Sequence, residues 1–402
     1  MPQSRFAPRW SLLMLMGLVL GSCAPSTFVA PRVRLQPAPT GPAASIGPAA
    51  GERWWRVLLH VHSVMNFVWW YSDVKEVIEI EAKDKVAREL GIFSRMRHYR
   101  PDTIASLLER AQRRGADAMV LTEHNTLSHA RDPLLAEVRG RTRLFKWSTE
   151  WTSVSRGGHA LLLGVGRDIR PLDSRKAGVR EFLSSTSAAR AEGATVVVCH
   201  PTTPNSPWKK LGLPETADAV EVINSWPFDG RGSEALWHEA LRKGRTLGAV
   251  AGADWHGTDA APAVADWRIT EVRASSLEER AIYEAIARGR TVARSSSPRK
   301  DIALRVLVDE RCREGDTCAV STPDTRVYIE VRGGYGLRLE VFDEASTSLS
   351  APALVLPVDR AQFRVAFTRA TPQRGFVRAV LRGIETVAAG SPVYLTRAAA
   401  AR

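Results

Sequence analysis

Two histidines separated by a single residue, His60 and His62, follow a short apolar segment. In a β-strand, residues two positions apart face the same side, so both imidazoles would point in the same direction. Neutral imidazole nitrogens that converge in this way are typical metal ligands. Alone, an H-x-H pair is also compatible with two hydrogen-bonded structural histidines, so its interpretation depends on the other residues that could join it.

Further histidines and carboxylates stand next to short apolar segments, where strand ends are predicted. They are Glu123, His124, Glu150, His159, His200, Asp254 and His256. In a parallel α/β barrel the carboxyl ends of the strands meet on one face, and active sites lie there. Polar groups buried at so many strand ends are costly to hold without a shared partner, and a metal cluster supplies one.

Each of these residues also has a structural interpretation, as a hydrogen-bonded group in the core or on the surface. His98, His129 and His238 lack the strand-end context, so we expect them to be structural or exposed. Cys199 precedes His200 in a predicted strand and should face the opposite side. We therefore expect Cys199 to pack in the core rather than bind metal.

The elements that must position these residues are predicted between about residues 53 and 298. Short apolar runs alternate there with helical patterns, such as residues 104–111 before Gly115. A capping box at residues 276–279 predicts the start of another helix, which would stop at Gly289. The predicted strands are residues 57–62, 118–122, 144–150, 159–165, 195–200, 219–224 and 246–254. Repeated strand–helix units indicate an α/β fold with a mostly parallel sheet, closed or nearly closed into a barrel.

After about residue 298 the pattern changes to an alternation of apolar and polar residues. The alternating runs are residues 302–308, 327–331, 337–341 and 363–367. Runs of this period predict a small antiparallel β-sandwich over residues 299–402. Cys312 and Cys318 are close enough in sequence to staple a hairpin by a disulfide, which an oxidising compartment would allow.

The N-terminus has the pattern of an export signal. An apolar run over residues 12–20 follows two arginines and is too short to span a bilayer, which predicts a signal peptide over residues 1–22. The residues up to Cys23 resemble a bacterial lipobox, which implies lipid attachment to that cysteine; an ordinary signal peptide is the alternative. Ala24 resembles an outer-membrane sorting signal. We expect a lipid-anchored protein of the bacterial cell envelope, on the outer membrane and facing the periplasm, with residues 23–52 as a proline-rich linker.

The composition limits the number of domains and the kinds of partner that we expect. A chain of 402 residues, 44% of them hydrophobic, is long enough for two or three domains with a sizeable core. The formal net charge is +13, but lysine and arginine are scattered and no nucleic-acid-binding motif is present. We therefore expect a solvated basic surface and no nucleic-acid partner.

The order of the motifs resembles the polymerase-and-histidinol-phosphatase (PHP) metallohydrolases, particularly the branch with carbamate-ester hydrolases and small phosphodiesterases. The matching set is H-x-H at residues 60–62, T-E-H-N at 122–125, Glu150, G-H at 158–159, H-P at 200–201 and D-x-H at 254–256. It covers about residues 55–298. The resemblance implies a distorted seven-stranded β/α barrel with two or three divalent ions, usually zinc, manganese or iron.

The resemblance also implies a role for each matching residue. One ion would be held by His60, His62, Glu150 and Asp254, a second by Glu150 with His159 and His200, and a third by His124 and His256. The sequence departs from the family at two places. Glu123 stands where the family usually has Asp, in a supporting role. The short ligand loop after H-x-H is replaced by an insertion over residues 63–100, in which Asp73 is the candidate ligand.

These residues predict a metal-dependent hydrolase. Bound cations lower the pKa of water, so that a metal-bridged hydroxide could attack a phosphorus or carbonyl centre. Glu150, Asp254 and His256 would be the catalytic residues, and either His256 as an acid or a third ion could assist the leaving group. We expect a phosphoesterase acting on a small phosphate ester. The alternatives are a carbamate, carboxylic ester or amide hydrolase on the same site, and a non-catalytic metal-binding envelope lipoprotein.

Aromatic residues adjoin the proposed ligands. Trp151 follows Glu150, Trp255 follows Asp254, and residues 69–71 add two tryptophans and a tyrosine. They could form a rim that binds an apolar or aromatic part of the small-molecule substrate, or they could simply fill the core.

Overall fold

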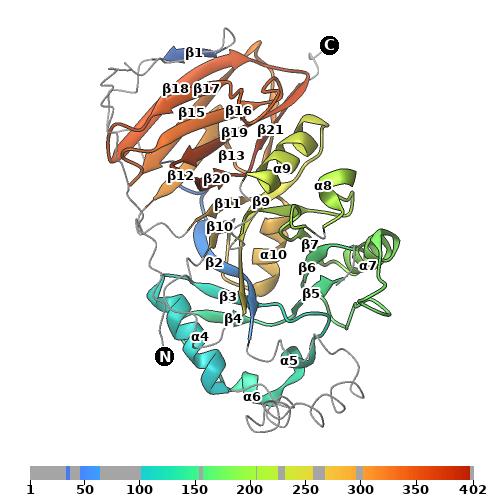
Figure 1. Cartoon of the computed structure of the whole chain (residues 1–402). Helices are drawn as coiled ribbons and strands as arrows, with labels where there is room; N and C mark the ends of the chain where they lie inside the picture. The colour runs from blue at the N-terminus through green and yellow to red at the C-terminus, as the bar shows by residue number, and fades with distance from the viewer. Residues whose placement is uncertain are drawn as a thin grey trace, which may run out of the picture.

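The computed structural model describes residues 33–36, 46–63, 101–153, 157–204, 206–224, 231–256, 268–295 and 302–398. Cys23, Asp73, His98 and the aromatic residues 69–71 lie outside these ranges. The described chain has a mixed α/β part and a sheet-rich C-terminal part, which lie one above the other in Figure 1. Among the described residues, no helix has the length and apolar character needed to cross a membrane.

Strand β2 (Arg53–His62) lies at the centre of the mixed part. It pairs in parallel with β3 (Ala118–Leu121) and with β9 (Gly248–His256), and antiparallel with β10 (Ile269–Ala274). β4 (Arg143–Phe145) continues in parallel from β3. The residues of β2 from Val57 to His62 are all buried, as expected for a strand with neighbours on both sides.

The pairing then runs round from β9 through four further strands. β8 (Ala219–Asn224) and β7 (Thr195–Val198) follow in parallel, and β6 (His159–Leu163) and β5 (Ser148–Thr152) follow antiparallel. An isolated parallel bridge between His124 and Glu150 joins the residues after β3 to β5. The sheet pairing and this bridge together form a ring of seven strands, β2, β3, β5, β6, β7, β8 and β9.

The interior of the ring is filled by apolar side chains. One buried cluster draws residues from β2, β3, β6, β7, β8 and β9, and it includes Ile282, Tyr283 and Ile286 of helix α10 (Glu279–Ala287). Because α10 packs into this cluster, the ring is a filled core and not a pore. The polar residues at the strand ends therefore lie at the edge of an apolar interior.

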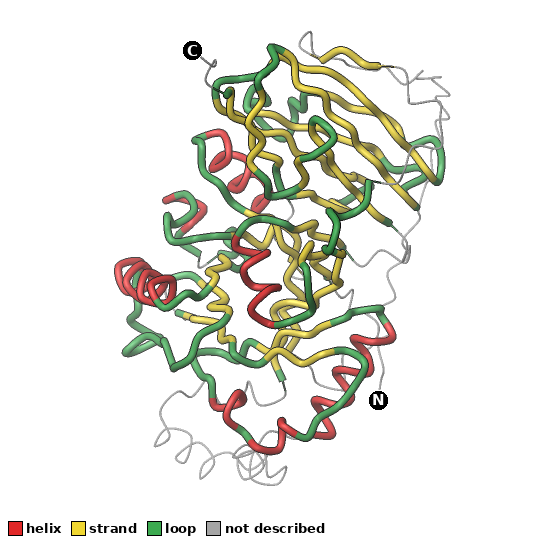
Figure 2. Tube along the Cα trace, turned by 180° about the vertical axis from the view of Figure 1, so that it is seen from behind, coloured by secondary structure: helices red, strands yellow, loops and turns green. Residues whose placement is uncertain are grey.

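The remaining helices lie around the strands (Figures 1 and 2). They are α4 (Pro101–Arg113), α5 (Ser128–Arg131), α6 (Pro133–Ala136), α7 (Val179–Ala191), α8 (Trp208–Leu211) and α9 (Gly232–Arg242). Helix α4 ends two residues before Gly115, whose φ of 79° breaks the helix, as the sequence predicted. The capping box predicted for α10 is wrong: Glu278 is the N-cap, and its side chain makes no capping hydrogen bond.

The prediction of a mostly parallel sheet is only partly correct. The pairs β5–β6 and β6–β7 are antiparallel, because the six residues between β5 and β6 are too few for the crossover that parallel strands require, and β6 therefore runs opposite to both neighbours. The strand predicted over residues 144–150 is two strands, β4 and β5. Strands β10 and β11 (Thr291–Arg294) were not predicted.

The C-terminal part has two sheets around one apolar cluster. The first sheet contains β1 (Val33–Gln36), β18 (Gln362–Ala370), β15 (Asp324–Arg332), β12 (Ala303–Val308) and β13 (Cys312–Arg313). The second contains β14 (Thr317–Val320), β21 (Val393–Arg397), β19 (Arg374–Arg382), β20 (Thr386–Gly390), β16 (Arg338–Asp343) and β17 (Leu354–Pro357). Apart from the parallel pair β14–β21, the strands within each sheet are antiparallel, as the period-2 pattern predicted.

Two features cross the boundaries predicted from sequence, and the predicted disulfide joins elements other than those expected. β1 lies within the predicted linker, where it pairs with β18. β20 pairs with β11, so the second C-terminal sheet continues into the mixed part across residue 298. Cys312 and Cys318 form a disulfide with a Cα–Cα distance of 5.8 Å. Because Cys312 lies in β13 and Cys318 in β14, the disulfide joins the two sheets and does not staple a hairpin.

Candidate metal centre

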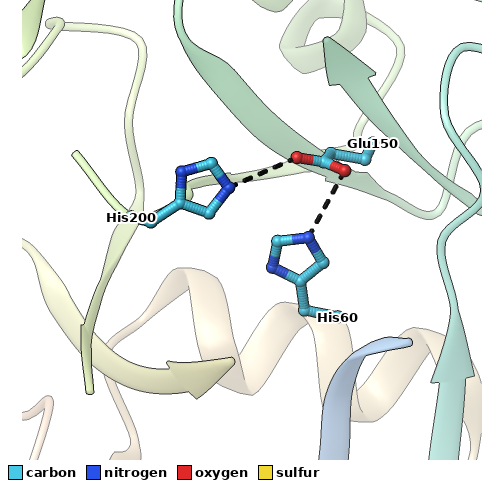
Figure 3. A group of neighbouring side chains, drawn as sticks. All are labelled: His60, Glu150 and His200. Atoms are coloured by element: carbon cyan, nitrogen blue, oxygen red, sulfur yellow. Dashed lines mark ion pairs between the residues drawn. The ribbon is translucent and has the colours of Figure 1, made fainter. Parts of the chain in front are cut away.

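The strand ends bring five of the proposed ligands into one buried cluster. His60 and His62 end β2, Glu150 lies in β5, and Asp254 lies near the end of β9. His200 lies two residues beyond the end of β7. Figure 3 shows His60 and His200 pointing toward the carboxylate of Glu150 from two different directions.

The first group of ligand atoms surrounds one point. The Nε2 atom of His60 lies 3.3 Å from Oε2 of Glu150 and 3.3 Å from Oδ1 of Asp254. His62 Nε2 lies 3.3 Å and 3.7 Å from the same two oxygens. Ligands at zinc distances of about 2.1 Å in a tetrahedron are about 3.4 Å apart, so this spacing fits a single ion.

A second group uses the other oxygens of the same two carboxylates. His200 Nε2 lies 3.6 Å from Oε1 of Glu150 and 3.8 Å from Oδ2 of Asp254. His159 Nδ1 is 2.7 Å from Oε1 of Glu150, which is a hydrogen-bond distance and shorter than the spacing of two ligands on one ion. The side chain of His159 is 27% exposed, so it lies where the cluster meets solvent.

The third proposed group is only partly described. The imidazole of His124 stacks on that of His62 with ring centres 4.4 Å apart. Its Nδ1 atom lies 2.7 Å from Oε2 of Glu150 and 2.7 Å from the hydroxyl of Thr152. The side chain of His256 is outside the described residues, although its backbone pairs with His62.

The cluster is almost fully buried, and its electrostatics are dominated by imidazole–carboxylate pairs. Burial alone would raise the pKa of Glu150, but the facing imidazoles of His124, His60 and His159 outweigh it and hold the pKa well below its usual range. His60 Nε2 is buried and makes no hydrogen bond with any described residue. A buried nitrogen directed at two carboxylates without a hydrogen bond fits a metal ligand.

The backbone is strained at the ligands themselves. Six described residues other than glycine have positive φ angles, and four of them belong to this site: His60 at 61°, Asn125 at 55°, His200 at 24° and Asp254 at 46°. The pairing of β2 with both of its parallel neighbours is irregular next to His60. Both imidazoles nevertheless face the same oxygen of Glu150, as expected for H-x-H, although β2 is distorted at His60. Left-handed backbone at bulky residues is typical of functional sites.

Two carboxylates outside the proposed ligand groups lie next to histidines of the cluster. Glu221 in β8 accepts a hydrogen bond from Nδ1 of His60 at 2.6 Å, and the sequence analysis did not select it. The available signal was a charged residue between the apolar residues Val220 and Val222 of the strand. Glu123 lies 4.0 Å from Nδ1 of His62 and accepts the Ser63 backbone N–H, in line with a supporting role. Burial raises the pKa of Glu123 to about 7 although its hydrogen bonds with Ser63 oppose the shift.

The other described residues from the sequence analysis are buried or half-buried. His129 and His238 are buried, and His238 pairs with the backbone carbonyl of Ser346. Cys199 is buried in the cluster inside the ring. Trp151 is fully buried against Phe182, with ring centres 5.2 Å apart, so it fills the core and does not form a rim. Trp255 is half-buried.

Comparisons with known proteins find similarity among solved structures. No family model matches the sequence, and no curated protein matches it. Among solved structures, the chain is similar to the crystal structure of a two-domain protein containing a predicted PHP-like metal-dependent phosphoesterase from Bacteroides vulgatus. The TM-score is 0.43 and the identity 14%, covering 90% of this chain and 99% of that chain.

Proposed function

We propose that this protein is a metal-dependent hydrolase of the PHP type that acts as a phosphoesterase on small phosphate esters. The ring of seven strands would be the distorted barrel of that family, and the cluster at its strand ends would hold at least two divalent cations. The observation that carries the proposal is the spacing of His60, Glu150 and Asp254, which come from three distant segments of the sequence.

The two carboxylates give the cluster its capacity for more than one ion. Glu150 directs Oε2 toward His60 and His62, and it directs Oε1 toward His200 and His159. Asp254 is divided in the same way, with Oδ1 toward His60 and Oδ2 toward His200. A pair of carboxylates shared between two sets of imidazoles is suited to two neighbouring cations.

When bound, divalent cations at this position would lower the pKa of water and neutralise charge on the ester oxygens. The residues of the chain hold the geometry in which that chemistry is useful. Burial of Glu150 and His60 excludes bulk water from one side of the cluster. The partly exposed His159 marks the side from which a substrate could approach and the place where a proton could be exchanged with it.

A phosphate ester is the substrate class that best fits this arrangement. Hydrolysis at phosphorus develops charge on several oxygens at once, and paired cations stabilise both the attacking and the leaving oxygen. Among the described residues no exposed cysteine nucleophile is present at this site, because Cys199 is buried. Hydrolysis of a carbon ester or amide by the same cluster is the competing outcome of the test.

The test combines metal analysis with a substrate panel. We expect purified protein to retain divalent metal and to hydrolyse bis-nitrophenyl or nitrophenyl phosphate in preference to nitrophenyl acetate. His60→Ala and Glu150→Ala should each lose bound metal and reduce turnover by at least about a thousandfold, because each removes an atom that faces the other ligands. His238→Gln is the matched control, since it alters a buried histidine that pairs with Ser346 and not with the cluster. Unchanged metal content in His60→Ala or Glu150→Ala would contradict the assignment, and faster cleavage of the acetate would favour the carbon ester.

A further inference from the structure

A buried carboxylate outside the proposed ligand set contacts the cluster. Glu221 is fully buried in the middle of β8, where its neighbours Val220 and Val222 are apolar. Its two oxygens accept hydrogen bonds on different sides. Oε1 accepts a hydrogen bond from Nδ1 of His60 at 2.6 Å. Oε2 accepts one from the backbone N–H of His200 at 3.0 Å and one from the side-chain amide of Asn224 at 2.7 Å.

These contacts fix which nitrogen of His60 carries a proton. A carboxylate only accepts hydrogen bonds, so Nδ1 must donate to Glu221. In the neutral imidazole the other nitrogen, Nε2, then keeps its lone pair, and Nε2 is the atom that faces Glu150 and Asp254. The same carboxylate also contacts the backbone of His200, so it contacts two proposed ligands of different ions.

Space for this carboxylate is provided by a glycine of the neighbouring strand. A Cβ atom placed on Gly252 of β9 would lie 1.9 Å from Oε1 of Glu221. Any larger residue at this position would displace the carboxylate. The φ angle of Gly252 is not in the positive region, so the chain needs glycine there for space and not for backbone conformation.

Direct metal binding by Glu221 does not fit this geometry. One of its carboxylate oxygens lies within 4.8 Å of ligand atoms of His60 and Cys199, which is close enough for a shared ion in principle. The 2.6 Å contact with His60 Nδ1 is a hydrogen bond, and it is too short for two ligands of one ion, which are about 3.4 Å apart in a tetrahedron.

We propose that Glu221 is a positioning residue that holds His60 with its proton on Nδ1, so that Nε2 is available as a metal ligand, and that Gly252 keeps the space this requires. The inference rests on the proposed function, because it assumes that His60 binds metal through Nε2. Carboxylate partners of metal-binding histidines generally act in this way, and their loss reduces metal affinity 10- to 100-fold.

Glu221→Gln tests the proposal because it keeps the size of the side chain and removes one acceptor. If the amide oxygen faces His60, its NH₂ group opposes the N–H of His200. If the amide is reversed, its NH₂ group faces Nδ1 of His60 and favours a proton on Nε2. Either arrangement disfavours metal binding. The expected result is zinc affinity about 10- to 100-fold weaker by chelator competition.

A second readout separates positioning from general destabilisation. In zinc-loaded protein labelled with ¹⁵N-histidine, His60 should show a hydrogen-bonded Nδ1 proton, identified by its absence in His60→Ala. This signal should be lost or shifted in Glu221→Gln. Gly252→Ala should weaken zinc affinity in the same direction without changing any polar group. Glu314→Gln is the control, because Glu314 is equally buried but accepts the backbone N–H of Val306 in the C-terminal part.

The outcomes distinguish the two proposals. Wild-type zinc affinity and an unchanged His60 signal in Glu221→Gln would overturn the inference, provided that His60→Ala loses zinc. Equal weakening in Glu314→Gln would also overturn it, because the effect would then be general. Retention of zinc by His60→Ala would instead overturn the proposed function.

Discussion

Burial alone raises the pKa of a carboxyl group and lowers that of an imidazole, and the buried groups of this protein differ in whether a partner offsets the shift. In Glu150 the surrounding imidazoles offset it and hold the pKa well below its usual range. His129 is buried outside the cluster, and its partners do not offset the effect of burial on its pKa. Burial lowers the pKa of His129 to about 4 although hydrogen bonds with the backbone of Lys146 and Ser148 oppose the shift.

The first prediction concerns this histidine. Because the folded state binds the His129 proton more weakly than the unfolded state, whose imidazole pKa is about 6.5, the stabilisation is complete above pH 6.5 and is lost as the pH falls toward 4. The shift corresponds to about 3 kcal/mol. Urea titrations between pH 4 and 8 should show that the free energy of unfolding of the wild type falls about 3 kcal/mol more than that of His129→Gln over this range. Parallel curves for the two proteins would contradict it.

Several site residues were predictable from the sequence because their chemistry is visible at a distance. His60, His200 and Asp254 each adjoin an apolar run, and a polar residue at a buried strand end needs a partner. Glu221 was not predictable in the same way. Its sequence signal is only a glutamate between two valines, and its contact with His60 depends on how distant strands meet in the fold.

At the level of elements, the closure of the ring between β3 and β5 holds Glu150 in place. The backbone N–H of Asn125 donates to the carbonyl of Glu150 at 2.8 Å, and the N–H of Glu150 donates to the carbonyl of Glu123 at 3.1 Å. The side chain of Asn125 bonds both the N–H and the carbonyl of Thr152, at 2.9 Å and 3.0 Å. Few hydrogen bonds form this closure, so each of them affects the position of Glu150.

The second prediction tests that closure. Asn125→Ala should lower the free energy of unfolding by about 2–3 kcal/mol, because two buried hydrogen bonds are lost and alanine is strained at a φ of 55°. Asn125→Gly loses the same hydrogen bonds without the strain, so it should be about 1 kcal/mol more stable than Asn125→Ala. Chemical denaturation of both variants measures the difference. Equal stability of the two would show that the backbone at Asn125 is not strained.

The elements themselves were predicted unevenly. Helix α4 and most strands of the ring follow from local periodicity, which the sequence contains. The antiparallel direction of β6, the pairing of β10 with β2, and the addition of β1 to β18 depend on contacts between distant segments. Local patterns carry no information about which neighbour a strand will find, so these features could not be predicted.

At the scale of the whole molecule, buried ion pairs connect the two parts. Glu234 of α9 pairs with Arg382 of β19 at 2.9 Å and with Arg378 at 3.4 Å. Arg378 lies over the rings of Trp237 and Phe342, 4.5 Å and 4.3 Å from their centres. Burial lowers the pKa of Arg378 to about 10, so it remains charged at neutral pH. Glu271 of β10 makes a similar link, because it pairs with Arg305 of β12 at 2.7 Å.

The third prediction follows from these links. Glu234→Ala should lower the free energy of unfolding by about 3–5 kcal/mol, because it leaves the buried charge of Arg378 uncompensated. The double variant Glu234→Leu with Arg378→Met removes both charges and should be less destabilised than Glu234→Ala.

Calorimetry should show a single transition in the wild type, since the two parts share buried pairs and a continuous sheet. Two separate transitions would contradict this coupling.

The pairing of β11 with β20 also bears on how such a protein can change over evolution. If the gene were divided at residue 298, each fragment would expose the unpaired edge of a strand, β11 in one and β20 in the other. Exposed strand edges promote aggregation. Exchange of the C-terminal part for an unrelated module would meet the same obstacle. We therefore expect the mixed part and the C-terminal part to be retained together as one unit.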